Sequence, residues 1–181
     1  MQLEMILAPE EFDRFRSEDT RPGVPSDYRV RTYRSGDEGQ YLALMQRVGF
    51  GWDEKTLSTT LNTMLPDGLF FIEHIPTAAI VASTVAGHGS SDFHPAGGEL
   101  GWVAVDPEHR GKRLGIVVCD EVLRRFIAAG YKDIILHTDE FRLPAIKTYL
   151  NLGFKPLMRN AELEDRWRIV FENLGLSNAD L

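Results

Sequence analysis

The sequence has little cysteine and lacks any apolar run long enough to cross a membrane. Cys119 is the one cysteine in 181 residues, so an internal disulfide framework is excluded. A membrane-spanning helix needs about 20 consecutive apolar residues, and no stretch reaches that length. The N-terminus, MQLEMILAPEEF, lacks the basic start and the cleavage site of a secretory signal. We therefore expect a cytoplasmic protein without a membrane segment.

Positive charge is also in deficit. The chain has 20 Lys and Arg against 27 Asp and Glu, which gives a formal net charge of −7 at pH 7. Such a balance argues against the phosphate backbone of a nucleic acid as a partner and favours a cationic partner such as an amine. Apolar residues make up 43% of the chain, which is ample for a hydrophobic core.

Several common ligand-binding motifs are missing. No GxxxxGK[ST] loop occurs, and no GxGxxG follows a predicted strand. His88, Asp92 and His94 match the spacing of no familiar metal site, so we predict no metal. Cys119 lies in a predicted helix among valines, where we expect a small buried hydrophobic residue rather than a nucleophile.

The most informative stretch is GELGWVAVDPEHRGKRLG, Gly98 to Gly115. We predict a strand from Glu99 to Val105, which Pro107 helps to end because proline has no N–H to give to a ladder. A Gly-rich basic loop then opens a helix that runs to about Ala129. The unpaired N–H groups of a helix start suit an anion such as phosphate. The residues alone also allow a simple strand-to-helix turn with solvated basic side chains.

The stretch resembles the acyl-CoA-binding signature of the GCN5-related N-acetyltransferases, the GNAT family. That signature is a V-x-V-x-P strand end followed by [RQ]-x-x-G-x-[GA], and the matching residues are Val103, Val105, Pro107, Arg110, Leu114 and Gly115. Arg113 stands where the family usually has its first glycine, and we expect it to adopt ordinary helical or turn angles. A second block, Ala145 to Phe154, resembles the family's A-x-x-x-Y-x-x-x-G-F segment.

The order of predicted elements agrees with this resemblance. We expect an α/β fold with a central mixed sheet and helices on both faces, in the order βααββ-βαβαβ, followed by a C-terminal helix. The predicted domain boundaries are an N-terminal extension over 1–28, a GNAT domain over 29–160 and a helical tail over 161–181. The extension allows a short strand at its start. The family's final strand is missing, because a helical pattern stands in its place.

Shorter features give local predictions. Asp53 is expected to cap a helix, and Gly130 to end one. Pro66-Asp-Gly68 predicts a turn before a strand from Leu69 to Ile75. Phe154 to Met158 is predicted as the last strand. Trp102 is expected in the core. For Trp52 we favour a place in the core over one in an acceptor pocket.

The resemblance implies which residues hold an acyl-CoA. The backbone of the loop would bind the pyrophosphate, and the strand end would bind the pantetheine arm. The predicted cofactor-binding residues are Val103, Ala104, Val105, Arg110, Gly111, Lys112, Arg113, Leu114, Gly115, Ile116 and Arg142. Arg142 stands where the family often has Asn, and either binds a CoA phosphate or stays solvated.

Two residues are candidates for proton transfer. Strand alternation places Glu99 on the same face as Gly101, Val103 and Val105, and family members place a general-base Glu at this spacing. Glu99 could act directly or through water, or could be an exposed residue at a strand end. Tyr149 matches the family's general acid toward the CoA sulfur, and its alternative is a core tyrosine.

The sequence therefore predicts an N-acetyltransferase that moves an acetyl group from acetyl-CoA to a primary amine by direct attack. The acceptor, a small molecule or a peptide, is not specified, and a homodimer is left open. One alternative is a catalytically silent acyl-CoA-binding or regulatory module on the same fold. Another is an interaction domain whose loop binds only incidental anions.

Overall fold

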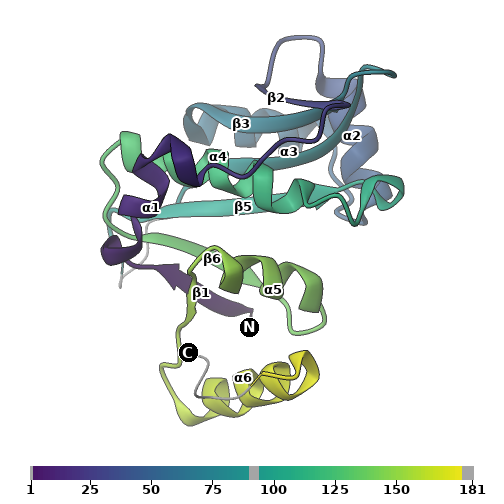
Figure 1. Ribbon diagram of the computed structural model, residues 1–181. Helices are drawn as coiled ribbons and strands as arrows, with labels where there is room; N and C mark the ends of the chain where they lie inside the picture. The colour runs from purple at the N-terminus through teal and green to yellow at the C-terminus, as the bar shows by residue number, and fades with distance from the viewer. Residues whose placement is uncertain (1, 90–93, 177–181) are drawn as a thin grey trace.

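The structure is a computed structural model that describes residues 2–89 and 94–176. A seven-stranded mixed sheet runs through it in the order β2-β3-β4-β5-β6-β1-β7. The strands are β1 Leu3–Leu7, β2 Tyr28–Thr32, β3 Met64–His74, β4 Ala79–His88, β5 Gly98–Val105, β6 Ile134–Thr138 and β7 Lys155–Pro156. The α-helices are α1 Asp13–Arg16, α2 Glu38–Arg47, α3 Glu54–Thr63, α4 Leu114–Ala128, α5 Leu143–Asn151 and α6 Ala161–Leu174. Figure 1 shows this arrangement, which confirms the predicted fold class.

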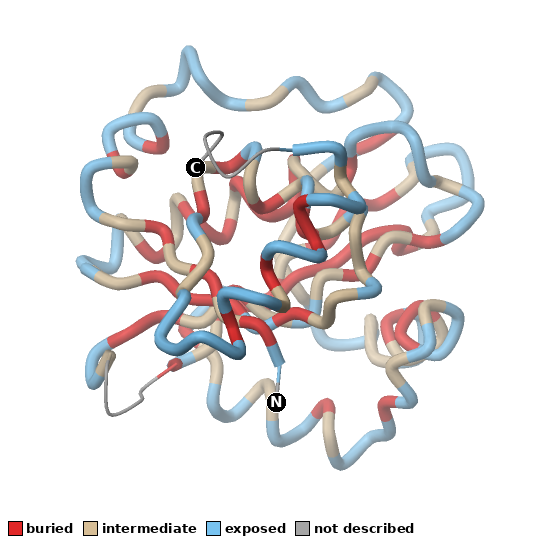
Figure 2. Tube along the Cα trace, turned by 90° about the horizontal axis from the view of Figure 1, so that it is seen from below, coloured by how far each residue is buried: buried red, intermediate tan, exposed pale blue. Residues whose placement is uncertain are grey.

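Helices cover both faces of the sheet. On one face, Tyr41 and Leu44 of α2 and Leu57 of α3 pack against Phe71 of β3. On the other face, α4 crosses β3, β4 and β5 with its buried apolar side, the residues Leu114, Val117, Val118, Val122, Leu123 and Phe126. The buried segments in Figure 2 follow the strands and the inner sides of these helices. The sheet is therefore the wall between two apolar layers.

Two predicted helix ends are confirmed. The carboxylate of Asp53 accepts a hydrogen bond from the backbone N–H of Thr56 at 2.8 Å and one from the Thr56 hydroxyl at 2.7 Å. Gly130 follows the last residues of α4 with a φ of 85°, a conformation that costs a glycine little. Both ends were readable from the sequence because the interactions that form them are local.

The N-terminal strand is an interior strand of the sheet. β1 pairs antiparallel with β6 from Leu3↔Thr138 to Leu7↔Ile134, and its other edge pairs with β7. Leu3, Met5 and Leu7 are each 0% exposed. In Figure 1 the first strand of the chain lies beside β6, far along the sequence. The N-terminal segment thus supplies an interior strand of the sheet, between β6 and β7.

Two strand predictions were wrong in detail. Pro66-Asp-Gly68 is not a turn between elements, because β3 begins at Met64 and passes through it with a shift of register against β4. Asp67 takes a φ of 56°, so the turn residues form an irregularity inside the strand. The predicted strand Phe154 to Met158 shortens to Lys155 and Pro156, since proline cannot donate to the ladder.

A bulge in β5 changes which side chains share a face. Val85 of β4 pairs with Gly101, but Ser83 pairs with Ala104, so β5 has one residue more than β4 over this interval. The predicted single face for Glu99, Gly101, Val103 and Val105 was therefore wrong. Val103 and Val105 pack on the α4 side, whereas Ala104 packs on the α2 side.

The same bulge explains the error for Trp102. Regular alternation would bury this side chain, but Trp102 has a φ of 56° and is 44% exposed. The extra residue in the bulge turns the indole out of the core. Trp52, in contrast, is 3% exposed and packs in the core beside α2 and α3.

Candidate functional site

Strands β5 and β6 separate soon after they meet. They pair in parallel only at Gly98↔Ile134 and Glu99↔Ile135. A cavity of about 530 Å³ lies next to the diverging end of β5. Its walls come from the end of β5, the loop before α4, the first turns of α4 and α5, and the segment after α2. The fold therefore gathers β5, α4, α5 and two connecting segments around one space at the edge of the opening.

The cavity brings together most of the residues predicted to hold a cofactor. Its lining includes Val103, Ala104, Val105, Arg110, Gly111, Arg113, Leu114, Gly115, Ile116 and Arg142. Lys112 is the exception: its ammonium group reaches back to the carbonyl oxygen of Glu108 at 3.4 Å. The sequence alone did not point to Val48, Phe50 and Thr148, which also line the cavity. No local pattern marks such residues, since only the tertiary fold brings their segments to β5.

The loop between β5 and α4 is anchored by a buried carboxylate. Asp106 is 6% exposed; its Oδ1 accepts from the backbone N–H of Glu108 at 3.0 Å, and its Oδ2 pairs with Nε of Arg47 at 2.8 Å. The hydroxyl of Tyr28 lies 2.9 Å from Nδ1 of His109. Burial lowers the pKa of His109, and the adjacent His74 adds to this shift. The loop is thus fixed to α2 and β2 before it reaches the helix.

Arg113 does not adopt the ordinary angles expected of it. Its φ of 61° and ψ of 17° are left-handed, the conformation that a glycine at this position would adopt freely. Its carbonyl accepts from the N–H groups of Ile116 at 3.1 Å and Val117 at 3.3 Å, so the turn leads directly into α4. With Gly111 also at positive φ, 77°, the backbone forms the kind of concave turn whose N–H groups bind anions.

Tyr149 reaches the cavity from α5. It is 6% exposed and lines the cavity together with Thr148 and Ala145 of the same helix. Burial raises the pKa of the Tyr149 phenol above its ordinary value near 10. The hydroxyl is therefore protonated at neutral pH and able to donate.

Arg142 joins α5 to the segment after α2. Its guanidinium lies 4.9 Å from the centre of the Phe50 ring, and its Nε pairs with Oδ2 of Asp139 at 3.0 Å. Both Arg142 and Phe50 line the cavity. The positive charge is thus held at the cavity wall by two aromatic rings, Phe50 and Phe141, and one carboxylate.

Glu99 occupies the last paired position before β5 and β6 diverge. Its Oε1 accepts a hydrogen bond from Nδ1 of His137 on β6 at 2.9 Å, and the two side chains are 38% and 39% exposed. This hydrogen bond raises the pKa of His137, with burial acting against it and the nearby Glu4 adding to the rise. The sequence did not point to His137, since only the register of β5 against β6 brings it to Glu99.

Glu99 lines a second cavity, of about 470 Å³, on the other part of β5. Gly101, Trp102 and His88 line it as well, together with residues of α3. The two cavities follow one another along the strand: Glu99, Gly101 and Trp102 line the one, and Val103 to Val105 line the other. β5 is thus the element that connects the two predicted catalytic residues with the predicted cofactor loop.

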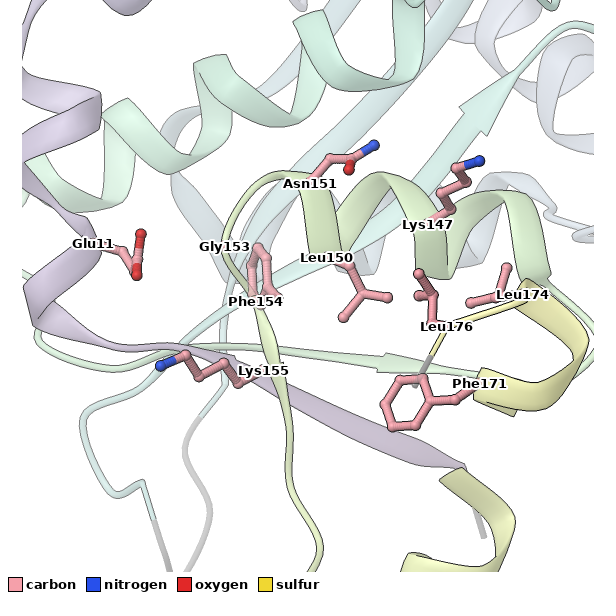
Figure 3. Close-up of a pocket in the computed structure, with 10 residues that line it drawn as sticks. All are labelled: Glu11, Lys147, Leu150, Asn151, Gly153, Phe154, Lys155, Phe171, Leu174 and Leu176. Atoms are coloured by element: carbon pink, nitrogen blue, oxygen red, sulfur yellow. The ribbon is translucent and has the colours of Figure 1, made fainter. Parts of the chain in front are cut away.

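A third cavity, of about 290 Å³, lies between α5 and α6 and contains none of the predicted site residues. Figure 3 shows its apolar side chains Leu150, Phe171 and Leu174, and Lys147 and Lys155 line it as well.

Cys119 is buried, and burial raises the pKa of its thiol. Within 2–89 and 94–176 no group of three or more His, Cys, Asp or Glu side chains could hold a metal ion. Asp92, which the sequence placed near His88 and His94, lies outside the described residues.

The chain matches a known family and several known proteins. The acetyltransferase (GNAT) family matches residues 37–154. The chain is 30% identical over 150 residues to a mycothiol acetyltransferase of Thermobispora bispora, an alignment that covers 74% of this chain and 48% of that protein. A solved GCN5-related N-acetyltransferase from Sphaerobacter thermophilus superposes with a TM-score of 0.65 at 18% identity, over 86% of this chain and 48% of the other. A tandem GNAT protein from the clavulanic acid biosynthesis pathway has a TM-score of 0.65 at 20% identity, over 86% of this chain and 50% of the other.

The chain belongs to the GNAT family of acetyltransferases, because the family match spans well over half of it. It covers about half the length of the curated relatives that it matches. Members of the family generally use acetyl-CoA and act on small-molecule or peptide acceptors. In the part of the chain that the structure describes, no helix is long and apolar enough to cross a membrane.

Proposed function

We propose that this chain transfers an acetyl group from acetyl-CoA to a primary amine by direct attack of the amine on the thioester. The observation that supports the proposal most is the 530 Å³ cavity, which is lined by the backbone turn at Gly111 and Arg113, the start of α4 and the buried Tyr149. A ligand with phosphate groups and a long neutral arm would fit this cavity, with the phosphates at the turn before α4 and the arm along the end of β5.

The donor would be held mainly by backbone groups. The first N–H groups of α4 have no partner within the helix, and the turn at Gly111 and Arg113 adds further N–H groups. The guanidinium groups of Arg110 and Arg113 bring positive charge to the same wall. Acetyl-CoA would supply the activated acyl group, and its arm would lie along the end of β5, where Val103, Ala104 and Val105 line the cavity.

Glu99 would accept the proton that the amine loses. It lines the second cavity at the point where β5 and β6 diverge, so an amine entering there approaches the donor along β5. The carboxylate accepts this proton directly or through one water molecule. His137, hydrogen-bonded to Glu99 at 2.9 Å, fixes the carboxylate's orientation.

Tyr149 would return a proton to the leaving thiolate. The amine nitrogen would add to the thioester carbonyl carbon, and the C–S bond would break as the carbonyl re-forms, so that the departing thiolate could take the phenolic proton. Burial raises the pKa of Tyr149, so the phenol carries its proton at neutral pH. Glu99 and Tyr149 therefore have opposite tasks, one in each cavity.

The first test is a thermal melt with and without saturating acetyl-CoA, with inorganic phosphate as the control. Ligand at about 100 times its dissociation constant stabilises a protein by about 2.7 kcal/mol, which for a chain of this size is roughly 5 to 10 °C. A shift of that size with acetyl-CoA and none with phosphate supports the proposed donor. No shift at millimolar acetyl-CoA would sink the proposal.

Two substitutions then separate an enzyme from a silent binding module. Tyr149→Phe and Glu99→Gln should each lower kcat by about 100-fold, within the range for loss of an acid or base. Both variants should keep the thermal shift with acetyl-CoA. Binding of acetyl-CoA without turnover across a broad amine panel favours the silent module. An unchanged turnover in both variants would instead remove Glu99 and Tyr149 from the proposed proton transfers. The panel includes compounds of the mycothiol type, because relatives carry that name.

A further inference from the structure

Trp102 differs in two ways from an ordinary residue of a central strand. It is 44% exposed, at a position where β5 has already separated from β6. Its φ of 56° is rare for a residue with a bulky side chain. Bulges often re-aim a side chain next to a functional site, and an outlier of this kind is a reason to look for a function.

Two aromatic rings, the half-buried Phe50 and the buried Trp52, fix the plane of the Trp102 indole. Phe50 meets it edge to face with ring centres 5.4 Å apart and an angle of 86°. Trp52 meets it at 4.9 Å and 77°, and is itself 3% exposed. An indole held by two T-shaped contacts is a rigid surface whose remaining exposed part can stack on a ligand at low entropic cost.

That exposed surface faces the same cavity as Glu99. The cavity has a volume of about 470 Å³, and the indole of Trp102 is the largest of the side chains that line it. Among the described residues that line it, Glu99 is the only Asp, Glu, Lys or Arg. Polar side chains of α3, Thr60 and Thr63, lie at the wall with Met64. The cavity thus combines one carboxylate with one flat apolar surface.

We propose that the acceptor is a primary amine attached to an aromatic ring, with the ammonium group bound at Glu99 and the ring stacked on Trp102. This inference rests on the proposed function, because the amine at Glu99 is the group to be acetylated. Ring stacking strengthens binding by about two- to tenfold beyond the effect of the apolar area that it buries. Trp102 would then select the acceptor, while Glu99 would accept a proton from any amine that reaches it.

Tryptophan fluorescence tests the inference without any need for turnover. The chain has three tryptophans, and Trp52 and Trp167 are 3% and 0% exposed, so a ligand stacked on an indole reports mainly on Trp102. The full chain is titrated with 2-phenylethylamine and, in parallel, with n-butylamine. We expect a saturable fluorescence change with the aromatic amine and a dissociation constant at least about fivefold lower than that of n-butylamine.

Substitutions identify the residue responsible. In Trp102→Ala, calorimetric titration should give the same dissociation constant for both amines, whereas Trp102→Phe should keep most of the preference. Ile169→Ala removes another exposed apolar side chain, 50% exposed on α6, and should leave both dissociation constants unchanged. Glu99→Gln should weaken the binding of both amines in the same proportion.

Equal binding of the two amines by the unmodified chain would overturn the inference. A preference for the aromatic amine that survives in Trp102→Ala would overturn it as well, and would mean that Trp102 only shields Phe50 and Trp52 from water. These titrations contain no acetyl-CoA. Failure of acetyl-CoA to bind would therefore count against the proposed function alone, and failure of the aromatic preference against this inference alone.

Discussion

Arg113 adopts an unfavourable backbone conformation. A left-handed φ of 61° costs a residue with a Cβ about 1 kcal/mol or more, and a glycine much less. We therefore expect Arg113→Gly to stabilise the ligand-free protein by about 0.5–1 kcal/mol, after allowance for the entropy that glycine adds to the unfolded chain. Urea unfolding at neutral pH measures the difference.

Arg113→Ala is the matched control, because it removes the same charge and keeps the strain. It should give no gain in stability. If the two variants unfold at the same urea concentration, the conformation of residue 113 is not the source of the difference. The dissociation constant of acetyl-CoA is then measured for Arg113→Gly and Arg113→Ala. Both variants keep the backbone N–H groups of the turn, so a difference between them reports the flexibility that glycine adds.

The bond between His137 and Glu99 predicts a dependence of stability on pH. The pKa of His137 is raised in the folded state, so the bond contributes fully below the ordinary His pKa of about 6.5 and is lost as the pH rises through the raised value. Both side chains are more than a third exposed, which limits the effect to about 1 kcal/mol or less. The free energy by which His137→Gln destabilises the protein should therefore be larger at pH 5.5 than at pH 9. An equal loss at both pH values would contradict the pairing.

At the scale of elements, β1 is the strand on which the second half of the sheet depends. It pairs with β6 on one side and β7 on the other, and Met5 at its centre is 0% exposed. Truncating a buried Met to Ala costs about 2–5 kcal/mol, so Met5→Ala should lower the unfolding free energy by an amount in that range. Gln2→Ala, at the exposed start of the same segment, should change it by less than about 0.5 kcal/mol. Denaturant titration of the two variants checks both values.

The elements that sequence predicted well are those fixed by local interactions. Asp53 caps α3 through a bond to Thr56, three residues away, and Gly130 ends α4 through its own backbone freedom. The alternation of Leu3, Met5 and Leu7 likewise indicated a strand. Its partner β6 begins more than 120 residues later, and nothing in a five-residue pattern specifies which strand it joins.

The candidate site likewise contains residues that the sequence located and residues that only the tertiary fold brings in. The residues of the cofactor loop follow one another in sequence, so one motif located nearly all of them along one cavity wall. The face of Val103 and the exposure of Trp102 depend on a bulge, which is set by the register of β5 against β4. His137 and Phe50 reach the site from other elements. Contacts of that kind follow from tertiary packing and not from spacing along the chain.

At the scale of the whole molecule, the net charge opposes the ligand that the proposed function requires. The chain carries a formal charge of −7, and acetyl-CoA is also an anion. Three basic residues are close together at one turn, Arg110, Lys112 and Arg113, and two of them line the cavity. Attraction to this turn acts over a few ångströms, whereas repulsion by the other charges acts over longer distances and is screened first by salt.

The direction of the salt dependence decides which of these fields governs binding. If the basic turn holds the phosphates, raising NaCl from 50 to 500 mM should weaken acetyl-CoA binding, by about fivefold for a site that is partly exposed. Acetyl-pantetheine, which has no phosphate, should bind with a dissociation constant that salt leaves within a factor of two. Isothermal titration with both ligands measures the contrast. Tighter acetyl-CoA binding at high salt would mean that the net charge of the molecule dominates, and that the turn before α4 does not hold the phosphates.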